Sequence, residues 1–140
     1  MRVVLSTVLL IVVLSCNFEK NCSVEGIIVQ SSVINQAQKL GFPYCLTFRK
    51  ALKKDETALL QLIRFAYKTD DISAIDHGIA FSELSVKLGD KFMSSFISKQ
   101  KDEHRLLIAK MFDACLEFRE PDLNLKKELP LSIQALRFKE

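Results

Sequence analysis

The chain has 140 residues, of which 49% are hydrophobic and 26% charged, and its formal net charge is +3 at pH 7. This hydrophobic content excludes a disordered chain, and the nearly balanced charge gives no basis for a nucleic-acid partner, which usually needs a concentrated basic face. The length suffices for one domain with a core of its own.

The first residues have the features of a secretory signal peptide. Arg2 supplies one positive charge, and an apolar run then extends from Val3 to Leu14. A run of about a dozen residues is too short for a membrane span, which requires about 20, but it matches the apolar part of a signal peptide. Small Ser15 stands at the expected cleavage position, so residues 1–15 are predicted to be removed.

The end of this segment, Val13-Leu14-Ser15-Cys16, resembles the lipobox of bacterial lipoprotein precursors. The resemblance implies that a diacylglycerol is attached to the Cys16 sulfur, that the signal is cut before Cys16, and that the new amino terminus is acylated. Val13 stands where leucine is preferred, and the motif covers only the export segment. Asn17 replaces the aspartate that retains lipoproteins in the inner membrane, which implies the outer membrane more than the inner.

The cysteines allow two interpretations, because an ordinary signal peptidase also accepts a cut before Cys16. If Cys16 is lipidated, the simplest disulfide joins Cys22 to Cys45, since an exported chain meets oxidising conditions. Cys115 lies in an apolar helical stretch and is then expected to be a small buried hydrophobe. If Cys16 is not lipidated, the four cysteines permit two disulfides.

From Gly26 onward the pattern is helical. Apolar residues recur at helical spacing up to Leu40, and Gly41 supplies a stop. A second helix is predicted to begin at Pro43, which suits the first helical turn. Its expected inward side chains are Leu46, Phe48 and Leu52.

The third helix, over residues 56–68, is predicted to start from Asp55 as its N-cap. A fourth helix is expected to be capped by Asp71 and closed by Gly89. A glycine within that helix, Gly78, costs about 1 kcal/mol relative to alanine and suggests that another helix passes very close. The buried candidates of the fourth helix are Ile72, Ile75, Ile79, Leu84 and Leu88.

Two further helices follow. Asp90 is predicted to cap a short helix over 91–100, and Asp102 a longer one over 103–118. The expected inward side chains of the longer helix are Leu107, Ile108, Met111, Cys115 and Leu116.

Beyond Pro121 the pattern changes. Leucines and isoleucines between Leu123 and Ile133 recur mostly at every second residue, which predicts an extended segment packed across the helices or a short strand. The expected fold is all-α, a small helical bundle or short HEAT-like stack of five to six helices with an extended C-terminal tail. The expected division is a signal peptide (1–15), a lipidated tether (16–25), a helical domain (26–120) and the tail (121–140).

The sequence offers no grouping of residues typical of catalysis or metal binding. His77 and His104 are the only histidines. The acidic residues next to them on a helix point in other directions, so neither histidine is preset with a carboxylate that would orient it as a base. Each is expected to be a surface or helix-end group. The acidic residues Asp70, Asp71 and Asp76 lack the ligand spacing of a calcium loop, and helix capping accounts for Asp70 or Asp71. We therefore expect no enzyme activity, no cofactor and no metal.

These observations predict a membrane-anchored cell-envelope lipoprotein, attached through Cys16, whose helical domain binds another envelope protein. It could serve as an assembly factor, an adaptor or an inhibitor. The alternative is a freely secreted effector held by disulfides. The sequence does not identify the partner.

Overall fold

The computed structural model describes residues 22–118 and 123–137. Within these ranges α-helix predominates, which confirms the predicted fold class, although the helices exceed the expected five to six. The elements in chain order are β1 (Cys22–Val24), β2 (Ile27–Val29), α1 (Ser31–Lys39), α2 (Tyr44–Leu52), α3 (Glu56–Phe65), the 3-10 turn η1 (Ala66–Lys68), α4 (Asp71–Leu88), α5 (Asp90–Ser98), α6 (Asp102–Phe118), α7 (Leu125–Glu128) and α8 (Pro130–Ala135).

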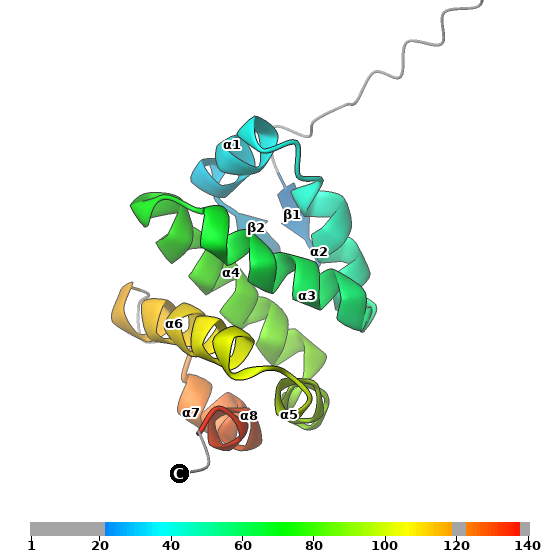
Figure 1. Ribbon diagram of the computed structural model, residues 1–140, viewed down its shortest axis with the longest axis vertical. Helices are drawn as coiled ribbons and strands as arrows, with labels where there is room; N and C mark the ends of the chain where they lie inside the picture. The colour runs from blue at the N-terminus through cyan, green and yellow to red at the C-terminus, as the bar shows by residue number, and fades with distance from the viewer. Residues whose placement is uncertain (1–21, 119–122, 138–140) are drawn as a thin grey trace, which may run out of the picture.

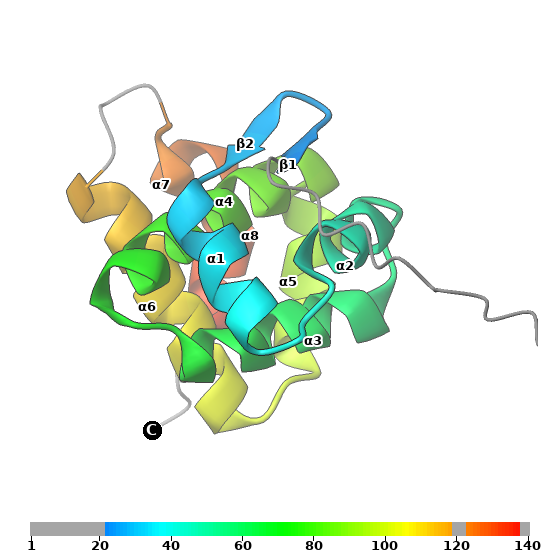
Figure 2. The same ribbon diagram turned by 90° about the horizontal axis from the view of Figure 1, so that it is seen from above.

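Helix α4 is the central element. It packs against α1, α2, β2 and η1 on one side, and against α5, α6 and α7 on the other. The hairpin, α1 and α2 therefore form one end of the molecule, and α5, α7 and α8 form the opposite end (Figure 1). Seen from above, α1 crosses over α3 and α4, with α2 beside it (Figure 2).

A close helix crossing lies at Gly78, where α6 packs on α4. A Cβ atom built on Gly78 would lie 3.0 Å from the Ala114 Cβ atom and 3.0 Å from the Met111 carbonyl oxygen. This confirms the expected close approach of another helix. At the same crossing the Ser82 hydroxyl donates to the Gly78 carbonyl at 2.8 Å, so this buried hydroxyl group is paired.

The predicted N-cap is confirmed at Asp55, displaced by one residue at Asp71, and wrong at Asp102, which is the first residue of α6. The Asp55 carboxylate accepts the Ala58 amide at 3.1 Å, as expected of the N-cap of α3. Helix α4 is capped by Asp70 instead of Asp71, because Asp70 forms a capping box with Ser73. Gly89, at φ 88°, ends α4 as predicted.

Asp90 does not cap its own helix; it is the first residue of α5. Its carboxylate instead accepts the backbone amide of Leu131 at 2.9 Å, and the amide and hydroxyl of Ser132 at 2.8 and 2.7 Å. These amides belong to the first turn of α8, which lacks a capping side chain of its own. Asp90 thus caps a helix that lies about forty positions further along the chain.

The extended conformation predicted for the C-terminal segment is wrong for residues 125–135, which form α7 and α8. Leu125 and Leu129 are fully buried, and their spacing of four residues is helical. Leu131, which the alternating pattern would bury, is 46% exposed. Pro130 at the first position of α8 separates the two helices, and this break produces the apparent alternation.

The first residues of the described chain form a hairpin, not a tether followed by a helix. Strand β1 pairs antiparallel with β2, with Cys22 opposite Val29 and Val24 opposite Ile27. The turn residues Glu25 and Gly26 both have positive φ, as a tight hairpin turn requires. β-branched side chains at alternate positions are buried here, so the period is two and not the 3.6 of a helix.

Three side chains expected to be inward are exposed: Leu46, Ile72 and Leu116. Leu46 is 52% exposed because Tyr44, Phe48 and Ala51 occupy the inner side of α2. Ile72 lies in the first turn of α4 and is 70% exposed.

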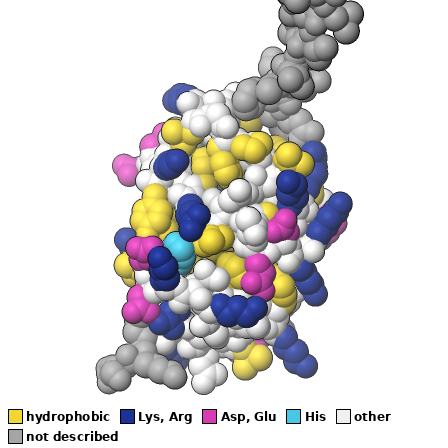
Figure 3. Space-filling view, turned by 45° about the vertical axis from the view of Figure 1, so that its right-hand side comes forward, with side chains coloured by type: hydrophobic (Ala, Val, Ile, Leu, Met, Phe, Trp, Pro, Cys, Tyr) yellow, Lys and Arg dark blue, Asp and Glu magenta, His cyan; other side chains and the backbone are white. Residues whose placement is uncertain are grey.

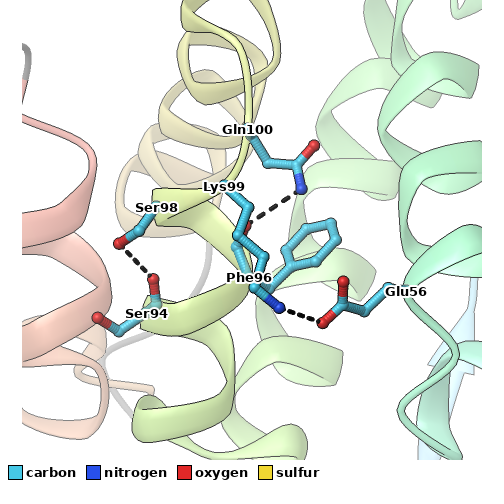
Figure 4. A network of polar contacts seen from close by, with 6 residues as sticks. All are labelled: Glu56, Ser94, Phe96, Ser98, Lys99 and Gln100. Atoms are coloured by element: carbon cyan, nitrogen blue, oxygen red, sulfur yellow. Dashed lines mark hydrogen bonds and ion pairs between the residues drawn. The ribbon is translucent and has the colours of Figure 1, made fainter.

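A polar network joins the end of α5 to the start of α3 (Figure 4). The Lys99 ammonium group lies 2.9 Å from a carboxylate oxygen of Glu56, and both side chains are about half exposed. Gln100 donates to the Phe96 carbonyl at 3.1 Å, which closes the last turn of α5. An ion pair with this exposure contributes about 0–1 kcal/mol to the free energy of unfolding, so it supports the fold only weakly.

Candidate functional site

The surface has a hollow of about 190 Å³ between the turn that follows α1 and the outer side of α3. Its lining is formed by Leu40, Gly41, Phe42, Gln61, Arg64, Phe65 and Lys68. The sequence alone did not indicate this hollow, because its two walls come from segments about twenty residues apart.

The turn that forms one wall is fixed by its sequence. The Phe42 amide donates to the Ala37 carbonyl at 2.9 Å and the Gly41 amide to the Gln38 carbonyl at 3.1 Å, as in a Schellman motif. Gly41 takes the positive φ of 63° that this motif requires. The motif directs Phe42 toward α3, where its ring stacks on Phe65 with centroids 4.9 Å apart.

The opposite wall comes from one face of α3 and η1. Gln61, Arg64 and Lys68 are spaced by three and four residues, so they line the same side, and all three are exposed. None of the lining residues is acidic. An apolar floor with a cationic rim is suited to a group that has an apolar body and a negative charge.

The floor of the hollow continues into a buried aromatic cluster. The Phe65 ring lies 5.2 Å from that of Tyr44 and 5.3 Å from that of His77, both edge to face. The expectation that His77 is a surface or helix-end group is therefore wrong, because His77 has no exposed surface.

The hydrogen bonds of His77 define its tautomer. Nε2 lies 3.0 Å from the Leu62 carbonyl, which can only accept, so Nε2 carries the proton. Nδ1 then accepts from the Tyr44 hydroxyl at 2.6 Å. The Leu62 carbonyl lies in the last turn of α3, whose carbonyls lack regular helical partners, and His77 supplies one.

Burial controls the protonation of both side chains. It lowers the pKa of His77 from 6.5 to about 4, against the opposing effect of the Leu62 hydrogen bond, so the imidazole is neutral at pH 7. Burial also raises the pKa of Tyr44. A neutral, fully bonded and inaccessible pair fixes the position of α2 against α3 and α4, but it cannot act on a substrate.

His104 is a helix-end group, as expected, but it is buried and does not lie on the surface. It lies in the first turn of α6, and its side chain has only a small exposed fraction. Its Nε2 lies 3.6 Å from a carboxylate oxygen of the exposed Glu103. The structure does not bring the two histidines together.

Two of the three clustered aspartates, Asp70 and Asp76, have structural partners. Asp70 caps α4, and hydrogen bonds from the Ser73 hydroxyl and amide lower its pKa. The Asp76 carboxylate accepts the Ser32 hydroxyl, which ties α1 to α4. Within residues 22–118 and 123–137 no group of three or more His, Cys, Asp or Glu side chains is placed to hold a metal ion.

The cysteines occupy distinct environments. Cys22 and Cys45 form a disulfide, with Cα atoms 5.8 Å apart, that joins β1 to the first turn of α2. Cys115 is free and buried against α4, as expected, and burial raises the pKa of its thiol. The predicted lipidation site Cys16 and the predicted signal peptide (1–15) lie outside the described residues.

Comparisons with known proteins give no relative. No family model, no curated protein and no solved structure matches this chain. In the described part of the chain, no helix is both long enough and apolar enough to cross a membrane.

Proposed function

We propose that this protein is an exported lipoprotein of the cell envelope, anchored through Cys16, whose helical domain binds another protein. Outer-membrane attachment is favoured over inner-membrane attachment by Asn17. Its role would be that of an assembly factor, an adaptor or an inhibitor, acting next to the membrane that holds it.

The observation that carries the proposal is the placement of the cysteines. Cys22 is paired with Cys45, and Cys115 is enclosed between α4 and α6. A second disulfide from Cys16 to Cys115 would require α6 to be displaced from the core. Cys16 thus has no partner available among the described cysteines, which favours lipidation, and a disulfide at Cys22 is compatible with export.

The candidate binding element is the hollow beside Phe42. It lies on a rigid frame, because the Schellman turn and the aromatic cluster beneath it fix both walls. Tethering would raise the effective concentration of this site toward neighbours on the same membrane. His77 and His104, which could serve acid-base chemistry if accessible, are buried.

The anchor is tested by the intact mass of the mature N-terminal peptide from the native host, with Cys16→Ala as the variant and Cys115→Ala as the matched control. We expect a diacyl or triacyl addition on Cys16, lost together with membrane association in Cys16→Ala and retained in Cys115→Ala. An unmodified Cys16 in the native protein would exclude the lipoprotein and leave the secreted effector.

The binding element is tested by a photo-crosslinking amino acid at Leu40, on the rim of the hollow, compared with the same amino acid at Leu106 on α6; both side chains are exposed. We expect one discrete protein adduct from position 40 in living cells, abolished by Arg64→Glu. Equal adducts from both positions would show that the hollow is not the binding element.

A further inference from the structure

The outer face of α2 is a second surface with a distinct chemistry. Leu46, Arg49, Lys50 and Lys53 are exposed and follow one another at helical spacing, opposite the buried side of the helix. No acidic residue occurs between Gly26 and Lys54. The face therefore combines one large apolar side chain with three cations.

Lysine and arginine side chains are spread over the face of the molecule drawn in Figure 3, with aspartate and glutamate side chains among them. Two other cations nearby in sequence have partners elsewhere. The Lys54 ammonium group lies 5.4 Å from the centre of the Phe92 ring, and Lys39 lies near Asp70. The outer face of α2 itself carries Lys50 and Lys53.

The chain before β1 determines where this face lies relative to the proposed anchor. Cys22 is six positions after Cys16, and six residues span at most roughly 20 Å. Because the disulfide joins Cys22 to Cys45, the distance from Cys16 is limited in a similar way for Cys45, in the first turn of α2. A lipid on Cys16 would thus keep the start of α2 close to the bilayer surface, while α7 and α8 lie at the opposite end of the domain (Figure 1).

We propose that the outer face of α2 docks on the anionic headgroups of the membrane, with Leu46 at the interface. This inference rests on the proposed anchoring for its orientation. Anionic lipid surfaces attract basic segments within about a Debye length, and each lysine at such a surface contributes roughly fivefold in binding. The docked domain would have a fixed orientation, with α7 and α8 at the end of the domain farther from the anchor (Figure 1).

The test uses the full mature chain with Cys16→Ser, so that binding does not depend on the lipid. Its cosedimentation is measured with vesicles of phosphatidylcholine alone and of phosphatidylcholine with 30% phosphatidylglycerol, at low and high salt. Lys50→Glu/Lys53→Glu is compared with Lys126→Glu/Lys127→Glu, an exposed pair on α7 with the same change of charge. Leu46→Ser tests the apolar contribution.

We expect salt-sensitive binding to the anionic vesicles alone, weakened at least about 25-fold by the α2 pair and less than threefold by the α7 pair. Leu46→Ser should weaken binding severalfold at both salt concentrations. Equal losses of vesicle binding from the two lysine-pair variants would overturn the proposal. Absence of binding to anionic vesicles would also overturn it, and would indicate an acidic protein as the partner of this face. Urea midpoints of the variants verify that each is folded.

Failure of the anchor would be visible separately. Binding by the Cys16→Ser chain reports on the α2 face alone, whereas the mass of the native N-terminal peptide reports on the lipid. An unmodified Cys16 together with intact vesicle binding would contradict lipid anchoring and support docking through the outer face of α2. A lipidated Cys16 without vesicle binding would contradict docking through this face and support lipid anchoring.

Discussion

The hydroxyl oxygen of Tyr44 lies 2.6 Å from Nδ1 of His77, in a part of the core without solvent exposure. The pair joins α2 to α4, and the second imidazole nitrogen joins α4 to α3. Three helices are thus held at one point by two hydrogen bonds. Because each polar atom is paired, the network specifies how these helices pack without the cost of a buried unpaired group.

Buried His77 makes stability depend on pH. Its pKa is about 4 in the folded protein and 6.5 when unperturbed, so between these values the unfolded chain binds a proton that the folded chain does not. The free energy of unfolding should therefore fall as the pH falls from 6.5 to 4, by about 3 kcal/mol from this residue. When the free energy of unfolding from urea titrations is plotted against pH, its slope between pH 4 and 6.5 should be smaller for His77→Gln than for the native protein. His104→Gln is the control, and an unchanged slope in His77→Gln would contradict the prediction.

Gly78→Ala should destabilise the protein, although alanine is the better helix former. The new methyl group would meet Ala114 and the Met111 backbone at 3.0 Å, and such overpacking costs about 1–3 kcal/mol, against about 1 kcal/mol gained in helix propensity. We expect a lower urea midpoint. In an Ala114→Gly background the same substitution should cost less than in the native protein, since one of the two contacts at 3.0 Å is absent. A midpoint above that of the native protein would show that α6 can move away.

Asp90→Asn should loosen α8 without unfolding the domain. The substitution removes the charge that strengthens the hydrogen bonds from Leu131 and Ser132, worth roughly 1–2 kcal/mol at a helix N-terminus. Hydrogen exchange should accelerate in residues 131–136 and remain unchanged in α4. Asp113→Asn, on the exposed side of α6, is the control.

The same contact predicts an acid-sensitive α8. Partial burial opposes ionisation of Asp90, but the bonds from the Ser132 hydroxyl and from both amides outweigh it and lower the pKa. This contribution is present above the ordinary pKa of aspartate and is lost as the pH falls through the lower, folded value. Acid should therefore reduce the protection of the α8 amides, relative to their intrinsic exchange rate at each pH, in the native protein. This reduction should be absent in Asp90→Asn.

The disulfide gives a thiol count that distinguishes the two interpretations of Cys16. In denaturant without reductant, a lipidated chain should show one thiol, from Cys115. An unmodified chain should show two thiols if Cys16 is reduced, and none if Cys16 is paired with Cys115. Removal of the disulfide by Cys22→Ala/Cys45→Ala should cost about 3 kcal/mol, because the bond closes a loop with a sequence separation of 23. Cys22 and Cys45 titrating as free thiols would contradict the pairing.

Local signals in the sequence predicted the helical fold well. Asp55 and Gly89 mark helix ends through their own side chain or backbone, and Gly78 marks a close crossing, so each is visible at one position. The hairpin and α7–α8 were missed because short segments contain too few residues to separate a period of two from one of 3.6. Their burial depends on α4 and α5, which pack against them.

The candidate site was less predictable, because its geometry arises from distant segments. Burial of His77 depends on Tyr44 and the Leu62 carbonyl, neither of which is near it in sequence. The Gly41-Phe42-Pro43 stretch gave the helix stop but not the wall of the hollow, since that wall requires Phe65 from α3. Single-position signals cannot specify such contacts.

The disulfide also determines how the domain would respond to mechanical force. A pull on the chain before Cys22 enters the domain at β1 and passes through the Cys22–Cys45 bond into α2. The hydrogen bonds between β1 and β2 therefore need not carry the load, and the hairpin cannot be peeled away from that end. Force would instead be distributed over the packing of α2 against α3 and α4, where the Tyr44–His77 contact lies.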